Sequence, residues 1–200
     1  MHHKALYSHR MLTLKDFSIL IHPGLNGSGP DHWHTHWEQA FPDFVRVQQA
    51  DWDHPVYDAW AATLTEYVNR ARKPVVLVPH SAGTTLVVKW SFEQAEAVKK
   101  VAGVFFVAPT DRDRPMPPGS ASPLQGFGGM ILKRLPYTSA VVASRNDERV
   151  SFERAQAFAQ AWGSQFFDAG LNGHLGSDAK LGVWPAGLVF FGQFLATLRA

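Results

Sequence analysis

The hydrophobic residues of this chain follow two patterns that alternate along its length. Short, nearly unbroken apolar runs predict strands that are buried on both faces, and apolar residues three or four positions apart predict amphipathic helices. The predicted strands cover residues 17–22, 44–50, 75–78, 101–107, 139–143 and 165–167. The predicted helices cover residues 31–40, with Asp31 as N-cap, 53–72, a stretch that ends near 95, 150–162, and a closing segment with apolar residues at 188, 191, 195 and 198.

Strands that alternate with helices along a chain are typical of a parallel sheet covered by helices on both faces. We therefore predict the α/β class, with a three-layer α/β/α sandwich around a mostly parallel sheet of about six strands. Residues 44–50 alternate apolar with polar side chains, which indicates a strand near the edge of the sheet. No linker or internal repeat interrupts residues 17–200, so we expect one domain there, after a loose N-terminal leader of residues 1–16.

Composition and charge narrow the class of protein. Apolar residues make up 46% of the 200-residue chain and charged residues 18%, a balance that is typical of a folded globular domain. The formal net charge is only +2 and no Lys/Arg cluster stands out, so we expect neither nucleic acid nor a membrane as partner. The chain has no Cys, which excludes disulfides, thiolate metal ligands and a cysteine nucleophile and is compatible with the cytoplasmic location that we expect.

The turn after residues 75–78 carries the first candidate for chemistry. A buried strand, a tight turn that holds Ser81, and a helix make up a nucleophile elbow, in which the turn lifts the serine hydroxyl above the sheet. Ala82 and Gly83 meet the need for small residues where strand and helix nearly touch. Pro79 stands where the usual G-x-S-x-G motif has its first glycine, and proline lacks an N–H. A buried turn that merely contains a serine is therefore the alternative.

A serine nucleophile needs a base, and the base needs an acid that orients it. His174 is the only histidine after Ser81, and it lies in a glycine-rich loop directly after the last predicted strand. That position is at the carboxyl ends of the strands, where ligands bind to such sheets. The sequence therefore predicts that His174 is the base, and an ordinary surface histidine is the alternative.

Asp147 is the preferred acid, because it ends the penultimate strand and so gives the chain order Ser, Asp, His of the hydrolase architecture. Its alternative role is the N-cap of the helix predicted at residues 150–162. Three other aspartates follow predicted strands and are the rival acids, namely Asp168, Asp111 and Asp113.

Two backbone N–H groups are predicted to bind the oxyanion that develops during acyl transfer. One belongs to Ala82, directly after the serine. The other is expected from Leu25 or Asn26, in a loop at residues 23–30 whose three glycines let the backbone approach a ligand closely. This loop lacks both the glycine spacing and the lysine of a nucleotide-binding loop, so no nucleotide site is predicted.

Three histidines at alternate positions, His32, His34 and His36, raise the alternative of a metal site. On a helix His32 and His36 share a face, as two metal ligands would. No glutamate stands between them in the manner of H-E-x-x-H and no third ligand is evident, so we predict no metal site. We expect this segment instead to pack under the first loop, with Trp33 and Trp37 against the sheet.

Taken together, these motifs resemble those of the small α/β-hydrolases of the retinoblastoma-binding-protein-nine and YdeN family. The resemblance spans residues 17–198 and rests on Pro23-Gly24 with Gly27-Ser28-Gly29-Pro30 and His32-Trp33, and on His80-Ser81-Ala82-Gly83, Asn146-Asp147, Gly173-His174 and residues 182–187. The family often has glycine or alanine at the position of Pro79, leucine at that of Ala82 and proline at that of Glu148, so this chain departs from the family pattern there.

The resemblance implies a serine hydrolase that acts on acyl esters, with Ser81, Asp147 and His174 as its triad, on a hydrolase fold without a large lid domain. It also implies a small-molecule ester as substrate and no cofactor. His80 and Trp184 lie in the matching motifs and are candidates for the substrate pocket. The alternative function is an interaction module on a hydrolase fold, with weak turnover or none and an unknown protein partner.

A long irregular stretch at residues 110–129, rich in Pro, Gly and Ser, follows the strand expected beside the nucleophile strand. Loops of this length inside a compact domain are usually functional or mobile. Its apolar residues Met116, Leu124 and Phe127 suffice to line an acyl pocket, so we predict that the loop forms the substrate-side wall. A surface crossover loop is the alternative, and residues 124–135 are compatible with a short helix.

Overall fold

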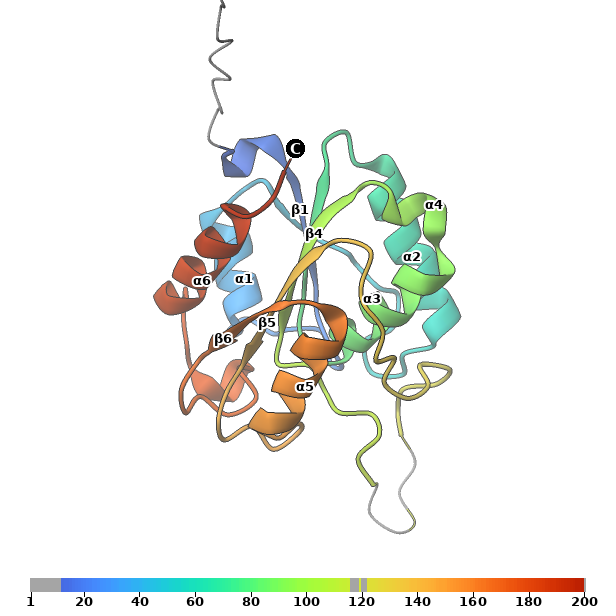
Figure 1. Ribbon diagram of the computed structural model, residues 1–200, viewed down its shortest axis with the longest axis vertical. Coiled ribbons are helices and arrows are strands. Elements are labelled where there is room, and N and C mark those ends of the chain that lie inside the picture. Colours follow the sequence, from blue (N-terminus) through green and yellow to red (C-terminus); the bar gives the residue numbers. More distant parts are fainter. Residues whose placement is uncertain (1–11, 116–118, 120–121, 200) are drawn as a thin grey trace, which may run out of the picture.

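The computed structural model describes residues 12–115, 119 and 122–199. These residues form one sheet in which every pair of neighbouring strands is parallel, in the order β2-β1-β3-β4-β5-β6 (Figure 1). The strands are β1 (Ser18–His22), β2 (Phe44–Arg46), β3 (Val75–Pro79), β4 (Val101–Val107), β5 (Thr138–Ala143) and β6 (Gln165–Asp168). The predicted α/β fold is confirmed, and the segment predicted near an edge is an edge strand, β2.

Helices cover both faces of the sheet (Figure 1). Their bounds are α1 (Trp33–Ala40), α2 (Tyr57–Arg70), α3 (Ala82–Glu93), α4 (Ala95–Val98), α5 (Phe152–Trp162) and α6 (Pro185–Leu195), with short 3-10 turns η1 (Leu14–Asp16) and η2 (Ser177–Ala179). Helices α1 and α6 pack on one face, and α2, α3, α4 and α5 pack on the other. The arrangement is the three-layer sandwich that the alternating pattern predicts.

The core consists of two clusters, one on each side of the sheet. Successive residues of β3 alternate between them, because neighbouring side chains of a strand point to opposite faces: Val75 and Leu77 pack with α2, α3 and α5, and Val76 and Val78 pack with α1 and α6. All residues of β3 are buried, as its unbroken apolar run predicts. Trp33 and Trp37 of α1 are fully buried in the second cluster, so the expected packing of the His/Trp segment is confirmed.

Two predicted helix starts are corrected by the hydrogen bonds at their ends. Helix α1 has His32 as its N-cap in place of Asp31, because the Nδ1 atom of His32 accepts the N–H of His34 at 3.1 Å. Helix α5 has Ser151 as its N-cap, whose hydroxyl accepts the N–H of Arg154 at 3.2 Å. Asp147 is therefore not the N-cap of that helix.

Three further boundaries differ from the prediction. The helix that was expected to end near residue 95 is divided at Gln94 into α3 and α4. Residues 124–135 contain no helix, because Gly126 and Gly128 take positive φ angles of 75° and 72°, which a right-handed helix does not allow. Strand β2 is shorter than the pattern suggests.

Near the N-terminus, Leu12 and Leu14 pack against the cluster of α1 and α6, and residues 1–11 of the expected leader lie outside the described residues.

The strand order creates one position where two neighbouring strands lead in opposite directions. From β1 the chain moves outward to β2, and from β3 it moves the other way to β4, so the loops after β1 and β3 separate above the sheet. Ligands bind in the crevice at such a switch point, at the carboxyl ends of the strands. This edge lies toward the bottom of Figure 1. No helix within the described ranges is long and apolar enough to cross a membrane.

Candidate functional site

Ser81 lies in the turn between β3 and α3, at the switch point of the sheet. Its backbone has φ 54° and ψ −122°, a conformation that non-glycine residues rarely adopt. The turn is held from both sides, because the N–H of His80 donates to the His22 carbonyl of β1 and the N–H of Ser81 donates to the Val107 carbonyl of β4, each at 3.1 Å. Pro79 ends β3 in register with His22 and does not interrupt the turn.

Two glycines allow the close approach of backbone segments around Ser81. A Cβ atom on Gly83 would lie 2.6 Å from the carbonyl oxygen of His22, so only glycine lets α3 start this close to β1. A Cβ atom on Gly24 would lie 2.8 Å from the Cβ atom of Ser81 and 3.1 Å from the amide nitrogen of Ala82. The loop after β1 therefore lies directly against the serine turn.

The structure brings together the three residues that the sequence suggests as nucleophile, base and acid. The Nε2 atom of His174 lies 2.7 Å from Ser81 Oγ. On the other side of the ring, the Nδ1–H group donates to Asp147, at 2.8 Å from Oδ2 and 2.9 Å from Oδ1. The carboxylate of Asp147 is fully buried, and Oδ1 also accepts the N–H of Arg149 at 2.7 Å. This arrangement leaves the lone pair of Nε2 free to accept the serine proton.

The loop that carries His174 is braced from the end of β5. The Oδ1 atom of Asn146 accepts the N–H of Gly173 at 2.8 Å, and Ser144 Oγ accepts the N–H of Asn172 at 2.8 Å. The ring of His80 donates its Nε2–H to the carbonyl of His174 at 2.9 Å. These contacts fix the backbone on both sides of the imidazole.

The rival acids are paired elsewhere. Asp168 accepts hydrogen bonds from the guanidinium of Arg145 on the surface, and Oδ2 lies 2.8 Å from its Nε. Asp111 and Asp113 both pair with Arg154, with oxygen–nitrogen distances of 3.1 and 2.7 Å. None of the three contacts His174 among the hydrogen bonds described, so the geometry favours Asp147.

One of the two donors suggested for the loop after β1 is not available. The N–H of Asn26 donates to the carbonyl of Trp52 at 3.0 Å, so Asn26 is excluded as an oxyanion donor. The N–H groups of Leu25 and Ala82 have no acceptor among the backbone hydrogen bonds of the described residues. They lie on either side of the contact that Gly24 makes with the serine turn. Leu25 and Ala82 are thus the remaining pair of candidates.

Thr110 is a neighbour of Ser81 that the sequence analysis missed. Its hydroxyl lies 3.2 Å from Ser81 Oγ. Because the serine hydrogen points to the imidazole, the Thr110 hydroxyl is the donor in this contact. Thr110 comes soon after β4, which is the neighbour of β3, so its position in the sequence could have indicated that it lies near Ser81.

A group of buried histidines lies beneath the site. Burial lowers the pKa of His22 to about 4 and that of His32 to about 3, and it holds the pKa values of His34 and His80 well below the usual range. These rings are therefore neutral at neutral pH. His34 Nδ1 is paired with Ser28 Oγ at 3.1 Å and His32 Nδ1 caps α1, so both serve the packing of the first loop.

A cavity of about 660 Å³ opens over Ser81. The described parts of the long loop line it through residues 110–112, 114–115 and 122–124, as the position of this loop after β4 predicts. Of the suggested pocket residues, His80 and Leu124 line the cavity. Phe127 and Trp184 do not, because Phe127 is buried beside Trp60 and Trp184 is buried between α1 and α6. Met116 lies outside the described residues.

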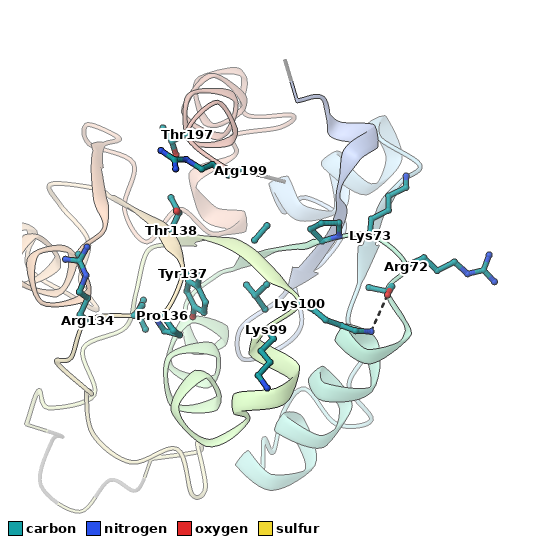
Figure 2. Close-up of a pocket in the computed structure, with 16 residues that line it drawn as sticks. Arg72, Lys73, Lys99, Lys100, Arg134, Pro136, Tyr137, Thr138, Thr197 and Arg199 are labelled. Carbon is teal, nitrogen blue, oxygen red and sulfur yellow. Dashed lines mark hydrogen bonds between the residues drawn. The ribbon is translucent and has the colours of Figure 1, made fainter. Parts of the chain in front are cut away.

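A larger cavity of about 890 Å³ lies at the opposite, amino-terminal edge of the sheet (Figure 2). Six cationic side chains line it, namely Arg72, Lys73, Lys99, Lys100, Arg134 and Arg199. Figure 2 shows that they spread outward, with Arg72 and Lys73 pointing away from the rest, and that Lys100 turns to the end of α2. Among the described residues its lining has no histidine and no acidic side chain, so these residues offer no base beside a nucleophile.

Comparisons with known proteins agree with this fold. A model of the serine hydrolase family matches residues 19–193. A YdeN-like hydrolase from Pectobacterium atrosepticum is 30% identical to this chain, with a TM-score of 0.79 over 90% of this chain and 91% of that one. The ydeN gene product from B. subtilis is 16% identical, with a TM-score of 0.65 over 90% and 98%. The type II thioesterase BorB from the borrelidin biosynthetic cluster is 16% identical, with a TM-score of 0.66 over 93% and 95%. None of the curated proteins compared with the chain matches it.

Proposed function

The chain belongs to the serine hydrolase family, and on that premise we propose that it hydrolyses small carboxylic esters through an acyl-enzyme formed on Ser81. The observation that carries this proposal is the continuous chain of hydrogen bonds from Ser81 through His174 to the buried Asp147, at the base of an open cavity. A nucleophile, a base and an orienting acid at these distances are the parts that acyl transfer needs.

In the first step His174 acts as general base. Its Nε2 atom takes the proton of Ser81 as Oγ attacks the ester carbonyl carbon, and the same proton then passes to the leaving alcohol. Asp147 accepts the Nδ1–H hydrogen bond, which keeps the ring in the required tautomer and stabilises the imidazolium that forms. The unusual backbone of Ser81 holds Oγ at the edge of the sheet, where a substrate in the cavity can reach it.

The tetrahedral intermediate carries a negative charge on the former carbonyl oxygen. The N–H groups of Leu25 and Ala82 are the proposed donors to that oxygen, because neither has a backbone acceptor among the described residues. Ala82 is also the first residue of α3, so the positive end of the helix dipole lies at the same place. Water then attacks the acyl-enzyme with His174 as base and releases the acid. These steps need no cofactor.

A fluorophosphonate probe of serine hydrolases tests the proposal. We expect wild-type protein to gain one phosphonyl group on Ser81, as measured by intact and peptide mass spectrometry, and Ser81→Ala and His174→Ala to gain none at the same probe concentration. Thr110→Val is a useful companion, because it removes a neighbour of Ser81 Oγ without removing the base. Lack of labelling of folded wild-type protein, beside a labelled control hydrolase, would rule out the proposed mechanism. The cytoplasmic location and the single-domain organisation stay predictions.

A further inference from the structure

Three arginines line the cavity above Ser81, namely Arg112, Arg114 and Arg149. All three come from the carboxyl edge of the sheet, with Arg112 and Arg114 in the loop after β4 and Arg149 in the turn after β5. The cavity is therefore bordered by positive charge on the side of the long loop. A neutral ester has no group that would use this charge.

Arg112 is the most informative of the three. Its side chain is partly buried, and it donates from Nη1 to Ser122 Oγ at 2.7 Å and from Nε to the carbonyl of Gly128 at 3.4 Å. Both acceptors are neutral, and no carboxylate in the described part of the chain pairs with it. Burial also lowers the pKa of its guanidinium. A desolvated charge that is held in place by neutral groups is ready to pair with a ligand of opposite charge.

The acidic residues near the cavity do not cancel this charge. Asp111 and Asp178 also line it, but the carboxylate of Asp111 is bound by Arg154 at 3.1 Å. Asp178 is exposed to solvent at the rim. Arg149 has a carboxylate 3.1 Å away, that of the exposed Glu148, so its pairing is weakened by water. Arg112 keeps an unbalanced positive charge on the same cavity as the serine hydroxyl.

We propose that this cavity selects esters that carry an anionic group, and that Arg112 is the specificity-determining residue that binds it. The anion is a carboxylate or a phosphate, because a planar guanidinium donates two parallel hydrogen bonds to either group. This inference rests on the proposed function, since it assigns a substrate class to the same site. The anionic group belongs to the acyl part or to the alcohol part of the ester, and the two sources require separate substrates in the test.

Matched pairs of esters measure the selection. For the acyl side the pair is 4-nitrophenyl butyrate and mono-4-nitrophenyl succinate, which differ in a terminal methyl and a carboxylate. For the alcohol side the pair is phenyl acetate and the same ester with a phosphate at the para position. The quantity measured is the ratio of kcat/KM for the anionic ester to kcat/KM for its neutral partner. It is measured in wild type, in Arg112→Gln and Arg112→Lys, and in Arg72→Gln, which removes a charge at the other edge of the sheet.

We expect a ratio above one in wild type for at least one pair, and a fall of about tenfold in Arg112→Gln, because charge-assisted hydrogen bonds are lost. Arg112→Lys keeps part of the ratio, and Arg72→Gln keeps all of it. High salt lowers the wild-type ratio, because it screens the attraction between the anion and the guanidinium. A wild-type ratio of one or less for both pairs, or a ratio that Arg112→Gln leaves unchanged, overturns the inference.

Binding without turnover separates this inference from the proposed function. In the Ser81→Ala variant, binding of monomethyl succinate and of methyl butyrate is followed by NMR. Anion selection is supported if the anionic ester binds more strongly and if the added substitution Arg112→Gln removes this preference. If no ester is hydrolysed but this preference is present, only the proposed function fails. Equal kcat/KM for the neutral and the anionic esters, in contrast, supports the proposed function and contradicts anion selection. If Arg112→Gln does not fold, as judged by its circular dichroism, the kcat/KM ratios of Arg112→Lys and of wild type at high salt test the inference instead.

Discussion

The two cavities at opposite edges of the sheet differ in what their side chains do. The amino-edge cavity is the larger, at about 890 against 660 Å³, and it has six cations in its lining. Its charged residues are exposed, and their side chains spread apart (Figure 2). At the carboxyl edge, side chains from three separate turns meet, and His174 lies within 3 Å of both Ser81 and Asp147. Convergence of groups, and not volume or charge, marks the candidate site.

The direction of the helices explains the charge of the amino edge. In this fold the helices run opposite to the strands, so their carboxyl ends and negative dipole ends lie at the amino edge. Five of the six cations there follow such ends, with Arg72 and Lys73 after α2, Lys99 and Lys100 after α4 and Arg199 after α6. Lys100 donates to the carbonyl of Asn69 in the last turn of α2 at 2.6 Å. Lys100 therefore stabilises the end of α2, whereas Ser81 and His174 at the carboxyl edge line a ligand cavity.

Asp147→Asn gives the largest expected contrast between the acid of the site and a surface acid. The amide cannot accept from Nδ1–H as a charged group does, so His174 favours the wrong tautomer, and we expect kcat to fall by on the order of 10⁴-fold with little change of fold. Asp168→Asn removes a surface ion pair with Arg145. Because such pairs contribute little net energy, we expect kcat to change by at most about twofold to threefold. Steady-state kinetics on one ester measures both. A larger loss in the Asp168 variant would reverse the assignment.

Gly24→Ala tests how closely the first loop must approach the serine turn. The new Cβ would lie 2.8 Å from the Cβ of Ser81, so loop and turn must separate, and the Leu25 N–H moves away from the oxyanion. We expect kcat/KM to fall about 100-fold, the effect of losing one oxyanion donor. The matched control is Gly29→Ala in the same loop, where a Cβ meets no atom within 4 Å. Equal activity of the two variants would show that the contact has no role in turnover.

Much of this site was readable from the sequence, because its three main residues come at strand ends. Ser81, Asp147 and His174 each follow a predicted strand, and in a parallel sheet all such positions lie at one edge. The sheet itself was readable because β3 and β4 are nearly unbroken apolar runs. Local patterns were sufficient here because each of these features depends on a few adjacent residues.

The errors about the site concern contacts between segments far apart in the chain. Asn26 was a predicted oxyanion donor, but its N–H donates to the carbonyl of Trp52 in another loop. Phe127 and Trp184 were placed in the pocket, but their rings pack into opposite core clusters. Thr110 and Arg112 were not considered, because the side-chain directions of an irregular loop are set by its partners and not by a periodic pattern. Sequence patterns therefore locate the edge of the sheet that carries the site but not its full lining.

Acid should destabilise the protein through a buried histidine at the carboxyl edge. Burial lowers the pKa of His22 from 6.5 to about 4. Between these two pH values the unfolded state therefore binds a proton at His22 that the folded state does not bind. Its contribution is therefore fully present above pH 6.5 and is lost as the pH falls toward 4. From the pKa difference we expect His22 alone to reduce the free energy of unfolding by about 2 kcal/mol between pH 7 and pH 4.5.

Urea denaturation of wild type and His22→Gln at these two pH values measures this effect. The variant should show a smaller loss on acidification, although it is less stable at pH 7 because His22 bonds both Pro23 and Gln49. The control is His54→Gln, since His54 is exposed and pairs only with Asp51 at the surface. An equal pH dependence in wild type and His22→Gln would mean that other groups account for the acid sensitivity.

The smallest effect is expected at the amino edge, from Lys100→Met. The ammonium group of Lys100 lies 2.6 Å from the Asn69 carbonyl and so satisfies an acceptor at the end of α2, which we expect to stabilise the protein by about 0.5 kcal/mol. The neighbouring Lys99 pairs only with Glu96 on an exposed surface, so Lys99→Met should change the free energy of unfolding by less than that. Both variants should keep wild-type kcat/KM, because the two cavities share no lining residue among the described ones. If Lys100→Met changes kcat/KM where Lys99→Met does not, the two edges are coupled and their separation into a structural and a chemical region is wrong.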